Sequence, residues 1–141
     1  MPKAVLDTNI LVSAFLFYER SGVPVALLHK AAEGRFILVT CRLILDELEN
    51  VLVRNASVQE RYGYTPEMAT TYRALLEARA ALVELQPPFP RVCRDQSDDM
   101  VVATAVSAAA DYLVTGDDDL LSLREHQGVR IVTPRQFLEA L

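Results

Sequence analysis

Cysteine and histidine are scarce in this chain of 141 residues, which limits the kinds of site that it can form. The two cysteines, Cys41 and Cys93, are far apart and match no metal-ligand or redox spacing. The two histidines, His29 and His126, are isolated and have no neighbouring ligand pattern. We therefore expect two reduced thiols and two surface histidines, rather than a site built on sulfur or imidazole.

Long hydrophobic runs are also missing, although 51% of the residues are hydrophobic. Charged or turn residues interrupt the apolar runs, which excludes a transmembrane span and predicts no membrane partner. The first residues, MPKAVLDTN, lack the successive basic, hydrophobic and cleavage segments of a secretion signal. No internal repeat or low-complexity tract is present. These absences predict a single cytoplasmic domain over residues 1–141, long enough to bury a core.

Lysine is the scarcest charged residue, since only Lys3 and Lys30 occur among fourteen basic residues. The net charge of −5 argues against a protein that coats nucleic acid nonspecifically. The arginine fork nevertheless fits phosphate, so an acidic chain can still make local phosphate contacts. A genome rich in G and C favours arginine codons and explains the same bias, so both interpretations stay open.

Short apolar runs alternate with amphipathic segments, which predicts an α/β domain with a mostly parallel sheet covered on both faces. Residues 86–90, QPPFP, form a loop, because proline fits neither a helix interior nor an inner strand. The expected strands are 3–7, 36–40, 111–115 and 129–133. The expected helices are 10–17, 21–34, 42–54, 65–83, 98–110, 118–126 and a terminal one from 134.

Two acids follow predicted strands. Asp7 ends the first strand, and Asp117 lies just beyond the strand at 111–115. Because the carboxyl ends of parallel strands face the same side, both acids should lie at the edge where α/β sheets bind ligands. Each also precedes a predicted helix, so helix capping is an alternative role for either acid alone.

Helix periodicity separates the acids of the segment 42–54. At about 100° per residue, Glu47 falls on the apolar stripe, roughly 60° from Ile44 and 40° from Val51. Asp46 and Glu49 point away and are expected to be solvated charges. Glu47 is therefore the acid that needs a function. The stripe consists of Ile44, Leu48, Val51 and Leu52.

The same test distinguishes the adjacent acids at the start of the helix 98–110. Asp98 falls roughly at the centre of the apolar face, whereas Asp99 lies about 90° away. The helix dipole favours both acids, and Ser97 can cap the helix, but neither effect explains an acid in the middle of an apolar face. A cation is expected opposite Asp98. The face consists of Val101, Val102, Ala105, Val106 and Ala109.

Four carboxylates are thus predicted to converge at one end of the sheet: Asp7, Glu47, Asp98 and Asp117. Without a cation they would repel one another, and hard oxygen ligands of this kind suit Mg²⁺ or Mn²⁺. Such ions clamp phosphate groups and activate water for in-line displacement. The residues alone predict a metal site for phosphate chemistry.

Four motifs, in this order, resemble the PIN-domain family of metal-dependent ribonucleases. They are VLDTNILVSA, LILDELENVL, DQSDDMVVATA and ADYLVTGDDDLL. The likeness spans nearly the whole chain and is strongest with the branch regarded as toxins of toxin–antitoxin systems. It implies a three-layer α/β/α sandwich with a mostly parallel central sheet. It also implies a Mg²⁺ or Mn²⁺ site that cleaves RNA phosphodiesters and leaves a 5′-phosphate and a 3′-hydroxyl.

The resemblance assigns the family's four acids, in order, to Asp7, Glu47, Asp98 and Asp117, which are the acids selected by geometry. One departure lies beside the third acid, where Gln96 follows Asp95 in place of the proline common in this branch.

Other positions of the motifs gain implied roles. Thr8 and Asn9 complete the opening motif, and Thr115 matches the family's hydroxyl residue before the last acid. Asp99 and Asp119 recur in related sequences and are further candidate metal ligands.

Three kinds of partner follow from the resemblance. RNA is the substrate, and Arg42 and Arg94 near the acid rim are candidates to hold its backbone. An antitoxin protein is the second partner. Relatives generally form homodimers, so the third is a second copy of this chain. The candidate interface residues, which the core could equally claim, are Val12, Phe15, Phe17 and Tyr18.

Other phosphate-handling folds fit less well. A haloacid-dehalogenase-like phosphatase needs a second acid two residues after the first, where this chain has Asn9. A phosphoacceptor receiver domain needs a late lysine, and the only lysines are Lys3 and Lys30. The remaining alternative is a PIN-like fold that binds RNA or protein without useful catalysis. Loss of an acid would favour it, and none is lost.

Overall fold

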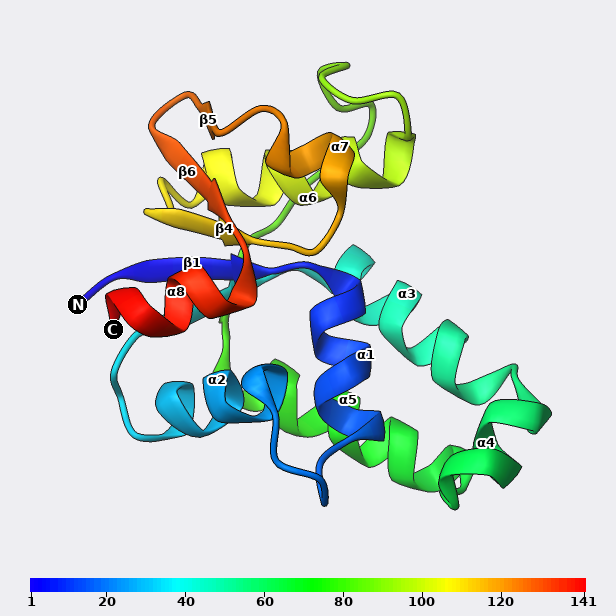
Figure 1. Ribbon diagram of the computed structural model, residues 1–141. Helices are drawn as coiled ribbons and strands as arrows, with labels where there is room; N and C mark the ends of the chain where they lie inside the picture. The colour runs from blue at the N-terminus through cyan, green and yellow to red at the C-terminus, as the bar shows by residue number, and fades with distance from the viewer.

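A mostly parallel, six-stranded sheet forms the centre of the computed structural model, which describes residues 1–141 (Figure 1). The strand order is β3-β2-β1-β4-β6-β5, and only β5 runs antiparallel to its neighbour. The predicted α/β fold is confirmed, and the four predicted strands correspond to β1, β2, β4 and β6. The strands are β1 (Lys3–Leu6), β2 (Ile37–Thr40), β3 (Ala81–Leu82), β4 (Tyr112–Val114), β5 (Glu125–His126) and β6 (Val129–Val132).

Eight helices surround the sheet, and none combines the length and the apolar character that crossing a membrane requires. Two of them begin at threonine caps, since the Thr65 and Thr133 side chains accept hydrogen bonds from backbone N–H groups of the first turn. The helices are α1 (Thr8–Leu16), α2 (Val23–Ala32), α3 (Arg42–Val53), α4 (Ala56–Tyr62), α5 (Pro66–Arg79), α6 (Gln96–Ser107), α7 (Asp118–Leu121) and α8 (Pro134–Ala140).

Three short elements differ from the sequence prediction. Strands β3 and β5 have two residues each, too few to show an alternating pattern. The helix predicted over 65–83 therefore ends at Arg79, and the one predicted over 118–126 is a single turn. Helix α4 is also unpredicted, although Asn55 caps its start and Gly63 ends it at a φ of 67°, which suits glycine.

Helices cover both faces of the sheet. Helix α6 packs on β1, β2 and β4 from one side, while α1, α2 and α8 lie on the other (Figure 1). At the α8 side, the buried rings of Phe36 and Phe137 meet edge to face with centroids 4.9 Å apart, and Tyr112 packs on Phe137. Burial of a phenylalanine side chain contributes roughly 1.5–3 kcal/mol, so this cluster anchors α8 to the sheet.

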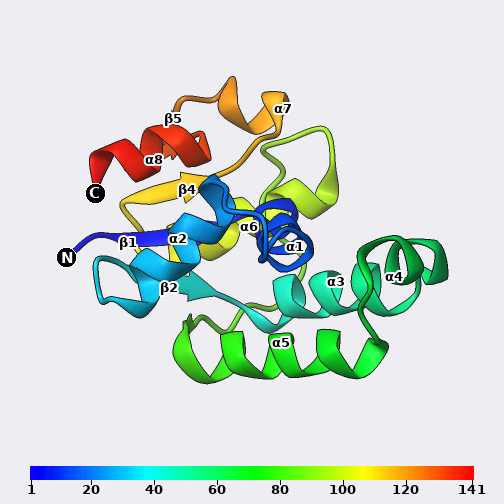
Figure 2. The same cartoon turned by 60° about the horizontal axis from the view of Figure 1, so that its bottom comes forward.

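Helices α3 and α5 run side by side, with α4 at their far end (Figure 2). The buried residues of α3 are Ile44, Leu45, Leu48 and Leu52. The predicted stripe is therefore displaced, because Val51 is exposed and Leu45 is buried instead. Both α1 and α5 pack on α3, which turns its buried sector toward Leu45. Glu47 consequently lies at the edge of this sector and is half-buried.

The carboxyl ends of β1 and β4 form one continuous edge. Strand β1 lies between β2 and β4, with Leu6 in register with Val114, so the order of strands along the sheet reverses beside β1. Ligands of open α/β sheets bind at such a reversal, outside the carboxyl ends of the strands. The residues that follow the two paired strands, Asp7 and Thr115, are placed at this position.

Candidate active site

A hydroxyl group connects the two strand-end acids. Thr115 Oγ1 donates to Asp7 Oδ2 at 2.8 Å and accepts from the backbone N–H of Asp117 at 3.0 Å. The other oxygen of Asp7 accepts from the backbone N–H of Thr8 at 2.8 Å, which caps α1. Asp7 is buried, so its carboxylate is held in one orientation. Thr115 therefore aligns Asp7 with the loop that carries Asp117.

Helix α1 also brings Glu47 to this edge. Thr8 Oγ1 donates to Glu47 Oε2 at 3.2 Å, so Thr8 contacts two predicted acids, Asp7 through its backbone N–H and Glu47 through its hydroxyl. Asn9, the third residue of the motif, is exposed, and its side chain forms no hydrogen bond. Thr8 thus has a clear structural connection to the acids, whereas Asn9 does not.

Asp98, in the first turn of α6, lies close to Asp117, which caps α7. Burial, a hydrogen bond with the Asp117 carboxyl group and the charges of Asp117, Asp7 and Asp95 raise the pKa of Asp98 to about 7. No arginine or lysine forms an ion pair with either group. The cation expected opposite Asp98 is not a side chain of this protein.

Asp7 and Glu47 have raised pKa values as well. Burial raises the pKa of Asp7 against the lowering effect of its bonds to Thr115 and Thr8, and the charge of Asp117 adds to the rise. Burial likewise raises the pKa of Glu47, partly offset by Thr8, and the charges of Asp7 and Asp95 contribute. Neighbouring negative charges therefore disfavour the ionised forms of Asp7, Glu47 and Asp98.

Asp95 is an acid at this edge that the sequence does not single out. Its Oδ1 accepts from the backbone N–H and the hydroxyl of Ser97 at 2.9 and 2.8 Å, and these bonds lower its pKa. It caps α6 in place of the predicted Ser97. The spacing Asp-x-Ser before a helix is the signal that could have identified it. Its charge nevertheless acts on both Glu47 and Asp98.

Asp99 is buried, although periodicity places it about 90° from the apolar face of α6. It is only 2% exposed, and its Oδ1 accepts from the backbone N–H groups of Val92 and Cys93 at 2.8 and 2.7 Å. Arg91 Nε lies 3.0 Å from Oδ2, at an angle that makes an ion pair but no hydrogen bond. Burial would raise the pKa of Asp99, but these partners lower it. Its carboxylate fastens the loop before α6.

The remaining candidates lie at the rim. Asp119 is exposed, and its backbone N–H donates to Asp117 Oδ1 at 2.9 Å. Arg42 is occupied by two acids, Glu77 at 3.1 Å and Glu84 at 3.6 Å. Arg94 is exposed on the loop before α6 and forms no ion pair. Of the two candidate RNA-binding arginines, Arg94 is thus the one with a free guanidinium group.

The acids do not form a ready-made cage, since no three His, Cys, Asp or Glu side chains have metal-ligating geometry. Their chemistry fits a hard divalent cation nevertheless. All four are oxygen donors, and none forms an ion pair with a cationic side chain. Mg²⁺ in proteins keeps several waters and is commonly bound through one or two carboxylates, so a complete cage is not required.

Comparisons with known proteins identify a family and agree with the fold. A family model described as PIN domain matches residues 3–119. The crystal structure of VapBC2 from Rickettsia felis, bound to a DNA fragment from its promoter, is similar in fold with a TM-score of 0.62. That match covers 93% of this chain and 98% of the other at 14% identity, so it concerns the fold alone. No curated protein matches the chain.

Proposed function

Because this chain belongs to the PIN-domain family, we propose that it is a Mg²⁺- or Mn²⁺-dependent ribonuclease that hydrolyses RNA phosphodiester bonds. The observation that carries the proposal is the meeting of buried and half-buried acids at the carboxyl ends of β1 and β4 without a cationic side chain. Proteins rarely bury several carboxylates together without cationic partners for structural reasons alone, whereas a site that binds cations needs such carboxylates.

Each acid has a defined task in this proposal. Asp7, Asp98 and Asp117 would hold the ion, and Glu47 would contribute directly or through a water molecule. When bound, the ion would supply an activated water molecule and neutralise charge on the phosphate oxygens. Thr115 keeps Asp7 oriented, as its hydroxyl does in the structure. Because the pKa of Asp98 is about 7, ion binding at this carboxylate should release protons near neutral pH.

A cleavage assay tests the proposal. Wild-type protein in Mn²⁺ should cut single-stranded RNA and leave 5′-phosphate and 3′-hydroxyl ends, whereas EDTA should abolish cutting. Asp7→Asn should reduce the rate by about 100-fold or more, because it keeps the shape of the carboxylate but removes its charge.

Asp111→Asn is the matched control. Asp111 is an exposed acid at the amino end of β4, on the opposite edge of the sheet, where it accepts from the backbone N–H of Lys3. This variant should cut RNA at the wild-type rate. Cleavage that persists in EDTA, or equally in Asp7→Asn, would contradict the proposal and identify a contaminating nuclease.

The alternative function is RNA binding without useful catalysis. All four acids are in place, which favours the enzyme. The same assay separates the two, because a binding module would retain RNA in a filter-binding experiment yet release no product. Arg94→Gln should then weaken RNA binding more than it changes the rate constant, since contacts to phosphate position the nucleic acid.

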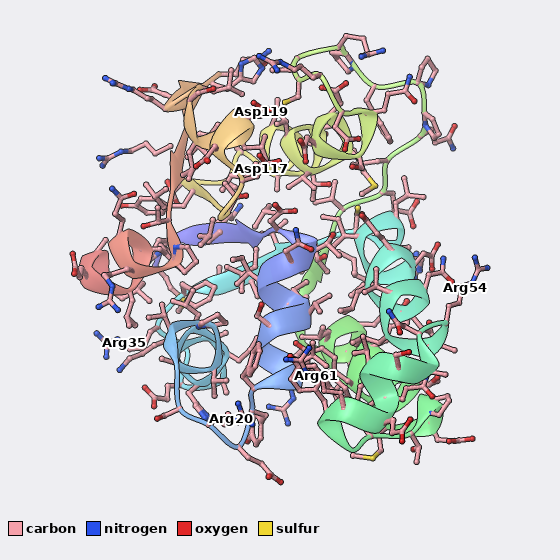
Figure 3. All side chains as sticks on the ribbon, turned by 45° about the vertical axis from the view of Figure 1, so that its right-hand side comes forward. Arg20, Arg35, Arg54, Arg61, Asp117 and Asp119 are labelled. Carbon is pink, nitrogen blue, oxygen red and sulfur yellow. The ribbon has the colours of Figure 1, made fainter.

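A groove lined mostly by apolar residues lies remote from the acids. The groove has a volume of about 1420 Å³ and lies between α1, α2, α4 and α5. Tyr18, Met68 and Leu75 line it and are 50–58% exposed. Arg20 and Arg61 also line the groove, and Figure 3 shows them at the other end of the molecule from Asp117. We assign this surface to the antitoxin expected for the toxin branch of the family.

The groove also bears on the expected homodimer. Phe15 and Tyr18 line the groove, whereas Val12 and Phe17 are half-buried within the fold, where the Phe17 ring packs on Tyr62. Co-purification of the product of a small neighbouring gene, lost in Leu75→Glu, would support the antitoxin assignment. Light scattering of the chain alone at micromolar concentration decides the homodimer, and a monomeric mass would exclude it.

A further inference from the structure

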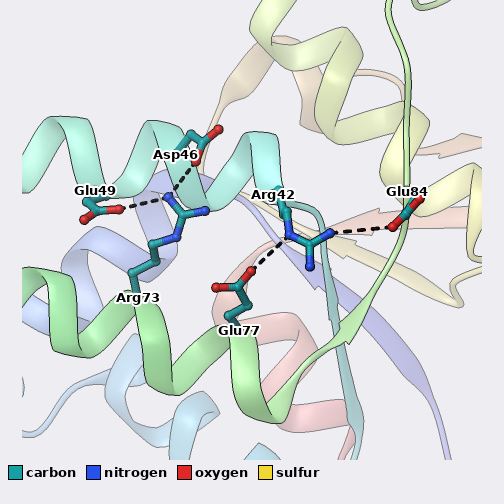
Figure 4. A network of polar contacts seen from close by, with 6 residues as sticks. All are labelled: Arg42, Asp46, Glu49, Arg73, Glu77 and Glu84. Atoms are coloured by element: carbon teal, nitrogen blue, oxygen red, sulfur yellow. Dashed lines mark hydrogen bonds and ion pairs between the residues drawn. The ribbon is translucent and has the colours of Figure 1, made fainter.

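Arg73 on α5 is the most buried cation among the ion pairs of this protein, with 19% of its side chain exposed. Its Nη1 atom contacts both Asp46 and Glu49 of α3 (Figure 4), at 2.9 Å in the case of Glu49 Oε2. Thr70 Oγ1 donates to the other oxygen of Glu49 at 3.1 Å. These two acids of α3 are therefore paired with α5. Asp46 is exposed, as expected of a solvated charge, whereas Glu49 is half-buried.

The two bound acids flank Glu47 in the sequence. At about 100° per residue, Asp46 and Glu49 lie roughly 60° apart on the side of α3 that faces α5, and Glu47 lies roughly 100° round from Asp46. On that side, Thr8 of α1 donates to the Glu47 carboxylate at 3.2 Å. Helix α3 is thus held from two directions, and its rotation sets the direction of Glu47.

The negative charges of these three acids are compensated unequally. Asp46, Glu47 and Glu49 put three negative charges within one turn of helix, where like charges destabilise one another. Arg73 offsets the two flanking charges, whereas Glu47 has no ion pair. Glu47 is the one acid of this turn whose charge is left for a cation at the sheet edge.

We propose that Arg73 is a positioning residue for Glu47, acting by binding the acids on either side of it and so fixing the rotation of α3. The proposal rests on the proposed function, because it gives Glu47 a part in holding the divalent cation. Arg73 touches neither substrate nor ion. Residues that orient metal ligands typically change metal affinity by 10–100-fold when removed.

A second ion pair between α3 and α5 provides a control for the possibility that Arg73 only connects these two helices. Arg42 at the start of α3 binds Glu77 of α5, with Nε and Oε1 3.1 Å apart (Figure 4). Glu77→Gln breaks this ion pair between the same two helices but leaves the neighbours of Glu47 untouched. If Arg73 only ties α3 to α5, Arg73→Gln and Glu77→Gln should have similar consequences.

The experiment measures Mn²⁺ affinity by calorimetry on the full chain, with circular dichroism in EDTA to verify folding. Arg73→Gln should weaken Mn²⁺ binding about 10-fold. Arg73→Lys should recover most of the loss, because a single nitrogen makes both contacts in the structure and an ammonium group can replace it. Glu77→Gln should stay within about 2-fold of wild type, since a half-exposed pair contributes little.

Two results would overturn the proposal while leaving the proposed function intact. The first is that Arg73→Gln binds Mn²⁺ with wild-type affinity although Glu47→Gln binds it weakly. The other is an equal loss in Arg73→Gln and Glu77→Gln, which would reduce Arg73 to a tie between helices. A wild-type protein that binds no Mn²⁺ would overturn the proposed function and this inference together.

Discussion

Asp98→Asn should lower metal-dependent RNA cleavage by about 100-fold or more and, in EDTA at pH 8, should raise the melting temperature of the protein. Asparagine preserves the shape of the side chain and removes a charge that crowds against Asp117 and Asp7. Loss of function with a gain in stability is the combination expected of a residue whose unfavourable charge serves to bind a cation.

The pH dependence of stability follows from the raised pKa of Asp98. In the folded protein this pKa is about 7, whereas an aspartate in an unfolded chain has a value of about 4. The folded state therefore binds the proton more tightly than the unfolded state. In metal-free wild-type protein, the contribution of Asp98 to stability should be largest below about pH 4 and should be lost as the pH rises through about 7.

Thermal melts in EDTA between pH 4 and pH 8 measure this effect. Relative to Glu139→Gln, an exposed control, Asp98→Asn should show a smaller loss of stability over this range. Mn²⁺ should restore wild-type stability at pH 8, because a ligand of the native state stabilises it, and should do less for Asp98→Asn. A melting temperature for Asp98→Asn below that of wild type at pH 8 would show that the carboxylate is stabilising, contrary to our interpretation.

The strand-end part of the site was predictable because it depends on local patterns. An apolar run that ends in Asp7, and another that leads through Thr115 to Asp117, place these side chains at one edge once the strands are parallel. The Thr115 contact itself follows from the pairing of β1 with β4 in register, which a resemblance to known proteins can suggest but periodicity cannot show.

Other features depend on contacts between distant segments and could not be predicted. Periodicity places Glu47 on the apolar stripe of α3, but the simultaneous packing of α1 and α5 shifts that stripe and leaves Glu47 at its edge. The role of Asp46 and Glu49 depends on Arg73, which lies on another helix. Asp99 is the clearest case, because the loop that buries it belongs to neither the sheet nor α6.

Asp99→Ala should lower the free energy of unfolding by roughly 2–4 kcal/mol, because it leaves two loop N–H groups without the acceptor that binds them. Arg91 adds little, since its guanidinium group is mostly exposed. Asp99→Asn should cost less than Asp99→Ala, because an amide oxygen can still accept from Val92 and Cys93.

The pH dependence of the Asp99 contribution is opposite in sign to that of Asp98. The folded-state pKa of Asp99 is lowered, so the stability it provides is present above about pH 4 and is lost as the pH falls through the lowered value. Urea denaturation in EDTA at pH 8 and pH 3 should therefore show a large deficit for Asp99→Ala at pH 8 and a smaller one at pH 3. Equal stability of Asp99→Ala and wild type at pH 8 would mean that the loop does not depend on this carboxylate. In the structure, the two adjacent acids of α6 have different roles. Asp98 lies near the other acids without a cationic partner, whereas the buried Asp99 binds the backbone of the preceding loop.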